Sequence, residues 1–214
     1  MTLLAALNRL HTLFEGDTNT PLTGDDYDVR VALINDAQEE WASQADVKWQ
    51  ELYTVDTSNE GDGTTRAFDL PADFGHLSGP IALYDTVHDA FTPIASVPIG
   101  QASGYASHSD LACWVADGQL VFNVAPEDGA TVYIYYYKTP TALTTNADVL
   151  PMSQPRYAIY YALARLTEQS GDFTRYNTNM QKAEDLLASM KIDNESLGEG
   201  VPNTIKTTTA GFGV

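Results

Sequence analysis

Residues 112–138 read ACWVADGQLVFNVAPEDGATVYIYYYK, and apolar and polar side chains alternate along three short segments of this stretch. The dipeptide Asp117-Gly118 separates the first two segments and supplies the positive φ angles of a two-residue turn, so it predicts a β-hairpin. A looser turn at residues 127–129 leads into the tyrosine-rich third segment. We therefore expect the three segments to form an antiparallel meander.

The same period-two pattern extends upstream to about Trp49, in short segments that are punctuated by turn residues. The predicted strands cover residues 51–56, 65–70, 80–85, 91–96, 112–116, 119–124 and 131–138. Short strands at roughly ten-residue spacing favour a small antiparallel sandwich or barrel.

Helical periodicity lies on both sides of this β region, because apolar residues there recur every three to four positions. The predicted helices cover about residues 3–14, 24–41, 154–170 and 173–190. Thr23 is the expected N-cap of the second helix and Ser153 that of the third. The last two helices are joined by a short link at Gly171, so we expect them to lie antiparallel.

This order predicts an α+β fold in which an antiparallel β domain is inserted into an antiparallel bundle of about four helices. We assign residues 1–48 and 141–193 to the bundle, with two helices in each segment. Residues 49–140 then form the sandwich-like or barrel-like β domain, and residues 194–214 an extended C-terminal tail.

The charge of the chain is strongly negative and unevenly distributed. Among 214 residues, 29 acidic and 11 basic side chains give a formal net charge of −18 at pH 7. A protein that grips nucleic acid neutralises phosphates with a basic face, so this balance excludes a DNA-gripping protein. Residues 50–137 hold 12 acids and 1 base, or −11, so most of the excess belongs to the predicted β domain.

The motifs of enzymes and metal proteins are not found in this sequence. The four histidines share no zinc-ligand spacing, and no serine lies in a nucleophile elbow. The single cysteine, Cys113, lies in an apolar strand, where a buried thiol is expected rather than a nucleophile. No segment approaches the roughly 18 apolar residues of a membrane span. We expect a protein without catalytic residues, metal, cofactor or membrane segment.

Tyrosines in the third segment are candidate contact residues, because aromatic side chains are enriched both in cores and in interfaces. One interpretation places them in the core of the β domain. The other places Tyr133, Tyr135 and Tyr137 at a contact with a neighbouring subunit. The sequence leaves both open.

Several short motifs follow one another in a characteristic order. They are Ile34-Asn35-Asp36-Ala37 with Trp41, Asp46-x-x-Trp49-x-x-Leu52, Leu70-Pro71-Ala72-Asp73-Phe74, Tyr136-Tyr137-x-x-Pro140-x-x-Leu143-Thr144, and Leu150-Pro151 with Tyr157 before a helix that breaks at Gly171-Asp172. Their order and spacing resemble the head-to-tail adaptor (connector) proteins of tailed bacteriophages. The resemblance covers about residues 25–192, and Leu-Pro-Ala-Asp-Phe is its most specific part.

The resemblance implies a structural virion protein that is assembled in the host cytoplasm. Such adaptors form a ring, expected to be dodecameric, beneath the portal protein and join it to a tail or nozzle protein. DNA passes through the ring channel without specific binding.

The resemblance also implies roles for particular residues. The C-terminal tail would dock on the portal, and its apolar residues are the candidate contacts: Val201, Ile205, Phe212 and Val214. The acids of the second helix, Asp36, Glu39 and Glu40, are candidates for the channel wall, where they would repel the DNA backbone.

The sequence leaves two other classes of function open. In the alternative, the β domain binds a protein or a carbohydrate and the helices form a stalk. An acidic hydrolase with a carboxylate pair is less favoured, because with 29 acids such pairs arise by chance.

Overall fold

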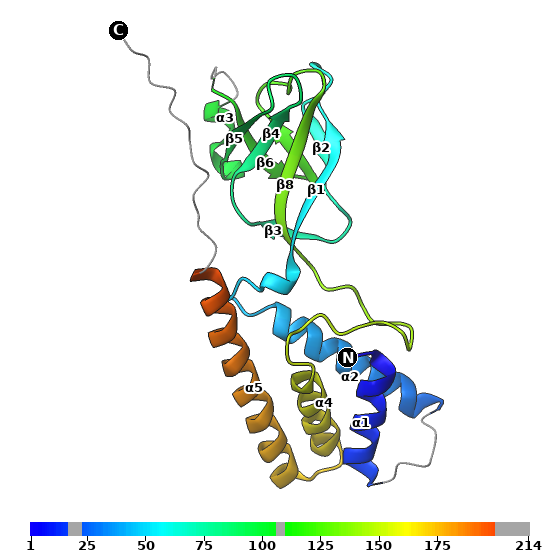
Figure 1. The fold of residues 1–214 in the computed structure, drawn as a ribbon. Helices are drawn as coiled ribbons and strands as arrows, with labels where there is room; N and C mark the ends of the chain where they lie inside the picture. The colour runs from blue at the N-terminus through cyan, green and yellow to red at the C-terminus, as the bar shows by residue number, and fades with distance from the viewer. Residues whose placement is uncertain (17–22, 106–109, 200–214) are drawn as a thin grey trace. The chain divides into compact units, whose positions relative to one another are not determined.

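The structure, a computed structural model, describes residues 1–16, 23–105 and 110–199 (Figure 1). Within these ranges it has five α-helices and eight strands, and the chain divides into two compact units. The helical unit contains Met1–Gln50 and the chain from Leu143 onwards, and the β unit contains Glu51–Ala142. The predicted α+β class is confirmed.

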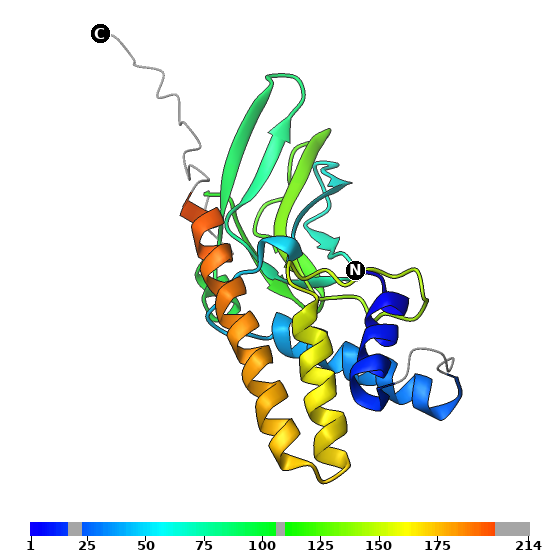
Figure 2. The same ribbon diagram turned by 60° about the horizontal axis from the view of Figure 1, so that its bottom comes forward.

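The helical unit is organised around one central helix. Its helices are α1 (Leu3–Glu15), α2 (Asp25–Ala42), α4 (Arg156–Gln169) and α5 (Phe173–Glu199). The first three helices and the start of the fourth match their predicted positions, and α5 continues past residue 193, where the tail was expected to have begun. α4 packs against each of the other three, and α2 runs obliquely to it (Figures 1 and 2).

The predicted helix caps are wrong at two positions. α2 begins after Gly24 instead of Thr23 and has no side-chain cap; three aspartates in its first turn complement the helix dipole instead. α4 begins after Pro155, which also makes no cap, whereas Ser153 lies outside the helix. Proline replaces the capping serine because its fixed φ suits a helix start and it has no N–H to satisfy.

Residues of the sequence motifs form two tertiary contacts in the helical unit. The Trp49 indole N–H donates to the Trp41 carbonyl at 2.7 Å, and the two rings lie 5.0 Å apart. The Asn35 side chain bonds both backbone groups of Leu143, accepting from its N–H at 2.8 Å and donating to its carbonyl at 3.1 Å. The first contact fixes the chain after α2, and the second joins the two halves of the helical unit.

The β unit is a nearly closed barrel (Figure 1). Its elements are β1 (Tyr53–Glu60), β2 (Ala67–Asp69), β3 (Phe74–Leu77), β4 (Ile81–Asp85), β5 (Ala90–Ser96), the short helix α3 (Ala102–Tyr105), β6 (Ala112–Ala116), β7 (Gln119–Phe122) and β8 (Ala130–Lys138). The strand order is β1-β8-β4-β5-β6-β7-β2, and β3 also pairs with β8. All pairs are antiparallel except β5 with β6, which is parallel.

The predicted hairpin is confirmed, but the predicted meander is wrong. β6 and β7 pair across Asp117-Gly118, and both turn residues have positive φ. β8 does not continue the hairpin, because the free edge of β7 is taken by β2, with Phe68 opposite Leu120. Instead β8 pairs with β1, β3 and β4.

The buried core of the barrel consists of side chains from six strands. Its buried members are Phe68, Ile81, Leu83, Ile94, Cys113, Leu120, Phe122, Val132, Ile134 and Tyr136. Burial raises the pKa of Cys113 to about 12, so its thiol is protonated at neutral pH. The predicted burial of Cys113 is confirmed.

Candidate functional site

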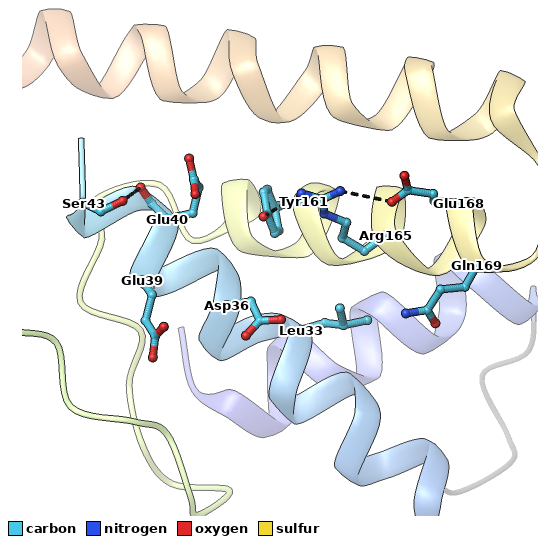
Figure 3. Close-up of a pocket in the computed structure, with 9 residues that line it drawn as sticks. All are labelled: Leu33, Asp36, Glu39, Glu40, Ser43, Tyr161, Arg165, Glu168 and Gln169. Atoms are coloured by element: carbon cyan, nitrogen blue, oxygen red, sulfur yellow. Dashed lines mark hydrogen bonds and ion pairs between the residues drawn. The ribbon is translucent and has the colours of Figure 1, made fainter. Parts of the chain in front are cut away.

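An acidic groove runs between α2 and α4 of the helical unit (Figure 3). It encloses about 610 Å³ and is lined by Leu33, Asp36, Glu39, Glu40, Ser43, Tyr161, Arg165, Glu168 and Gln169. The three acids predicted to line a DNA channel, Asp36, Glu39 and Glu40, therefore lie together on one groove. Whether they face DNA stays a prediction.

The helical repeat of α2 explains why these acids share a side. Positions i, i+3 and i+4 lie on one face of an α-helix, and Asp36, Glu39 and Glu40 have this spacing. The opposite face carries the buried residues Ala37 and Trp41. The three acids are exposed, and none forms an ion pair with any residue that the structure describes.

One cation lies in the acidic groove and is already engaged. Arg165 donates to the Glu168 carboxylate at 3.1 Å and to the Tyr161 hydroxyl at 3.2 Å (Figure 3). These hydrogen bonds raise the pKa of Arg165 above its usual value. Nearby, burial and then the charge of Glu40 raise the pKa of Tyr157. The groove thus keeps a negative excess that could attract a cationic group.

A second surface, here called the aromatic face, covers one side of the barrel. Residues alternate along β8, so that Val132, Ile134 and Tyr136 enter the core while Tyr133, Tyr135 and Tyr137 share the other side. Neighbouring strands extend this side with Tyr53, Tyr84 and Phe91. The structure therefore brings together the three tyrosines predicted to meet another subunit.

The members of the aromatic face differ in exposure. Phe91 is 52% exposed and packs edge-on against Tyr133, with ring centroids 5.2 Å apart. Tyr137 is only 8% exposed; the ring of His76 stacks on it with centroids 5.1 Å apart, and Tyr53 packs edge-on at 5.8 Å. Tyr133 and Tyr135 are half-buried. The outermost side chains of this face are Phe91 and Tyr53, which the sequence did not single out.

A third surface, the basic groove, lies among α1, α4 and α5. It encloses about 290 Å³ and is lined by Leu13, Tyr160, Leu163, Thr174, Arg175, Thr178, Asn179 and Lys182. No acid is among these residues. Sequence reasoning missed this groove, since its lining residues come from helices that are distant in the chain.

The cations of the basic groove are held over aromatic rings. Lys182 Nζ lies 5.3 Å from the Tyr160 ring centroid, and the Arg175 guanidinium lies 6.0 Å from that of Phe14. Arg175 also donates to the Leu13 carbonyl at 3.2 Å and lies 4.0 Å from the Asp172 carboxylate. Both side chains are exposed; Asp172 partly offsets the charge of Arg175, whereas Lys182 forms no ion pair with any residue that the structure describes.

The remaining predicted contacts are not covered by the structure. The candidate portal contacts Val201, Ile205, Phe212 and Val214 lie outside the described residues. Among the described residues, no group of three or more His, Cys, Asp or Glu side chains could hold a metal ion. None of the helices in the described ranges has the length and apolarity to cross a membrane.

Comparison with known protein families finds a match over most of the chain. The family model described as SU10 adaptor protein matches residues 1–204. No curated protein matches the chain.

Proposed function

Because the chain belongs to the SU10 adaptor protein family, we propose that it is the head-to-tail adaptor of a tailed bacteriophage. Copies of the chain form a ring beneath the portal protein, with twelve copies as the expected number. The ring joins the portal to a tail or nozzle protein and leaves a channel for DNA. The match to the family model over residues 1–204 carries this proposal.

The proposal places the protein in the virion, at the junction between head and tail, after assembly in the host cytoplasm. The role is structural, and an adaptor needs surfaces that bind the neighbouring proteins. The grooves of the helical unit and the aromatic face of the β unit are three such surfaces. We also propose that the four long helices are arranged as a four-helix bundle.

We assign the aromatic face to a contact between neighbouring copies. Aromatic side chains bury large areas at a low entropic cost and are enriched in interface cores. The double substitution Phe91→Ser and Tyr135→Ser should weaken self-association without unfolding the barrel. Ile99→Ser, an exposed apolar position of the β unit outside this face, is the control. If the double variant assembled as the parent does, the face would have only a packing role.

The negative charge of the β unit suits a channel that DNA passes through. Residues 51–142 carry 12 acids and 2 bases, or −10, and a ring multiplies this charge by its copy number. An acidic wall repels the phosphate backbone and prevents DNA from adhering during passage. DNA is therefore cargo that moves past the protein and not a ligand.

In vitro complementation tests the proposed function. A phage that lacks this chain should accumulate filled heads and separate tails, and adding the purified protein should join them. Normal virions from the deleted phage, or no joining after the protein is added, would contradict an adaptor role.

A further inference from the structure

The acidic and basic grooves lie on opposite sides of the central helix α4. Tyr161 and Arg165 line the acidic groove, whereas Tyr160 and Leu163 line the basic one. At about 100° per residue, these two sets of positions point roughly 150° apart around the helix axis. The acidic groove and the basic groove thus face away from each other on one rigid helix.

The two grooves have opposite charge. The acidic groove carries four carboxylates, from Asp36, Glu39, Glu40 and Glu168, against the single guanidinium of Arg165. The basic groove carries Arg175 and Lys182 without any acid in its lining. In a chain with a net charge of −18, a groove of this sign is unusual and favours an anionic partner.

An amide on the same helix face as the two cations adds a hydrogen-bond donor to the basic groove. Asn179 lines the basic groove and is only 6% exposed, yet its side chain makes no hydrogen bond to any residue that the structure describes. Solvent reaches the polar atoms of this amide, so they can also bond a partner that enters the groove. Its NH₂ group, between two cations, suits a carboxylate.

We propose that the basic groove of one copy receives the acidic groove of the next copy in the ring. The carboxylates of Asp36, Glu39 and Glu40 face Arg175 and Lys182 of the neighbour. This inference rests on the proposed function, because it specifies how the ring of that function is built.

The arrangement has the symmetry that a ring requires. A contact between two different surfaces is heterologous, so each added copy exposes the same free surface again until the ring closes. Ion pairs at such a contact add little affinity individually, but they fix the partner and its orientation. The wider apolar surfaces supply the affinity.

The proposal changes the role expected for the acids of α2. In the ring they contact a neighbouring copy instead of lining the channel, and repulsion of DNA is left to the acids of the β unit.

Charge reversal tests the contact. An acid-reversed variant (Glu39→Lys with Glu40→Lys) and a base-reversed variant (Arg175→Glu with Lys182→Glu) are each mixed with the portal. The size of the assembly is read by mass photometry. Glu184→Lys with Asp185→Lys, on an exposed part of α5 outside both grooves, is the control. Circular dichroism verifies that all variants fold.

Each reversed variant alone should require at least about tenfold more protein to assemble, because like charges then face each other. An equimolar mixture of the two should assemble like the parent, since every contact again joins opposite charges. The control should assemble normally.

Three results would overturn the inference: assembly of either reversed variant alone at the parent concentration, failure of the mixture, or loss of portal binding by the base-reversed variant alone. The last result would assign the basic groove to the portal. Failure of the parent protein to assemble on its portal would instead contradict the proposed function.

Discussion

Asn35 joins two segments of the helical unit that are more than 100 residues apart in the chain. Its side chain satisfies both the N–H and the carbonyl of Leu143, at 2.8 and 3.1 Å, as a neighbouring strand would. Asn35→Ala leaves both backbone groups without this partner. We expect a loss of about 1–3 kcal/mol in the free energy of unfolding, measured by urea denaturation. Asn177→Ala, at an exposed position of α5, should change it by less than about 0.5 kcal/mol.

Tyr136 gives the β unit a pH dependence at high pH. Burial, and then the hydrogen bond to Asp73 at 2.9 Å, raise the pKa of Tyr136 to about 12. An unfolded tyrosine ionises near pH 10, so the folded state holds its proton longer than the unfolded state. The stability from this group is therefore complete below pH 10 and is lost as the pH rises towards 12.

Tyr136→Phe removes this contribution and should flatten the decline in unfolding free energy above pH 10. Urea denaturation at several pH values measures the slope. Tyr176→Phe, on α5, is the matched control. An unchanged slope in the Tyr136 variant would show that this phenol does not titrate with unfolding.

At the scale of elements, β3 depends on a glycine. The register of β3 against β8 shifts between Phe74 and His76, and a Cβ on Gly75 would lie 2.7 Å from the Tyr137 carbonyl oxygen. Gly75→Ala should therefore destabilise the β unit by about 1–3 kcal/mol in thermal or urea unfolding. Gly79→Ala meets no atom within 4 Å and should be nearly neutral. Equal effects would mean that the close approach at Gly75 relaxes freely.

Local patterns predicted the elements better than their partners. The hairpin at Asp117-Gly118 could be predicted because its signal lies within two residues. The strands that pair with β8 could not be predicted, since they depend on how segments distant in the chain are arranged in space. β3 escaped prediction because four residues that include Gly75 and His76 show no clear alternation.

In the candidate site, too, local spacing predicted which side chains lie together, whereas contacts between distant segments could not be predicted. The spacing of Asp36, Glu39 and Glu40 places them on one side of α2, and alternation along β8 places its odd-numbered tyrosines on one face. The basic groove needed α1, α4 and α5 together. Motif residues such as Asn35 and Asp73 form hydrogen bonds that stabilise the fold. The motifs therefore indicate the family because its members share this fold.

At the scale of the whole molecule, the C-terminal segment is the proposed link to the portal. Deleting residues 201–214 should reduce binding to the portal by at least about tenfold, because apolar anchors dominate such contacts. Surface plasmon resonance on immobilised portal measures the loss. Replacing Lys206 and Thr207 by alanine keeps the apolar anchors and serves as a control. Unchanged binding after deletion would move the portal contact to another surface.

In the proposed function, copies of this chain form a ring on the portal. Electron microscopy of the purified chain mixed with its portal tests it most directly. We expect a closed ring of copies, twelve in number, seated on the portal around an open channel. A chain that stays monomeric and leaves the portal bare under these conditions would contradict it.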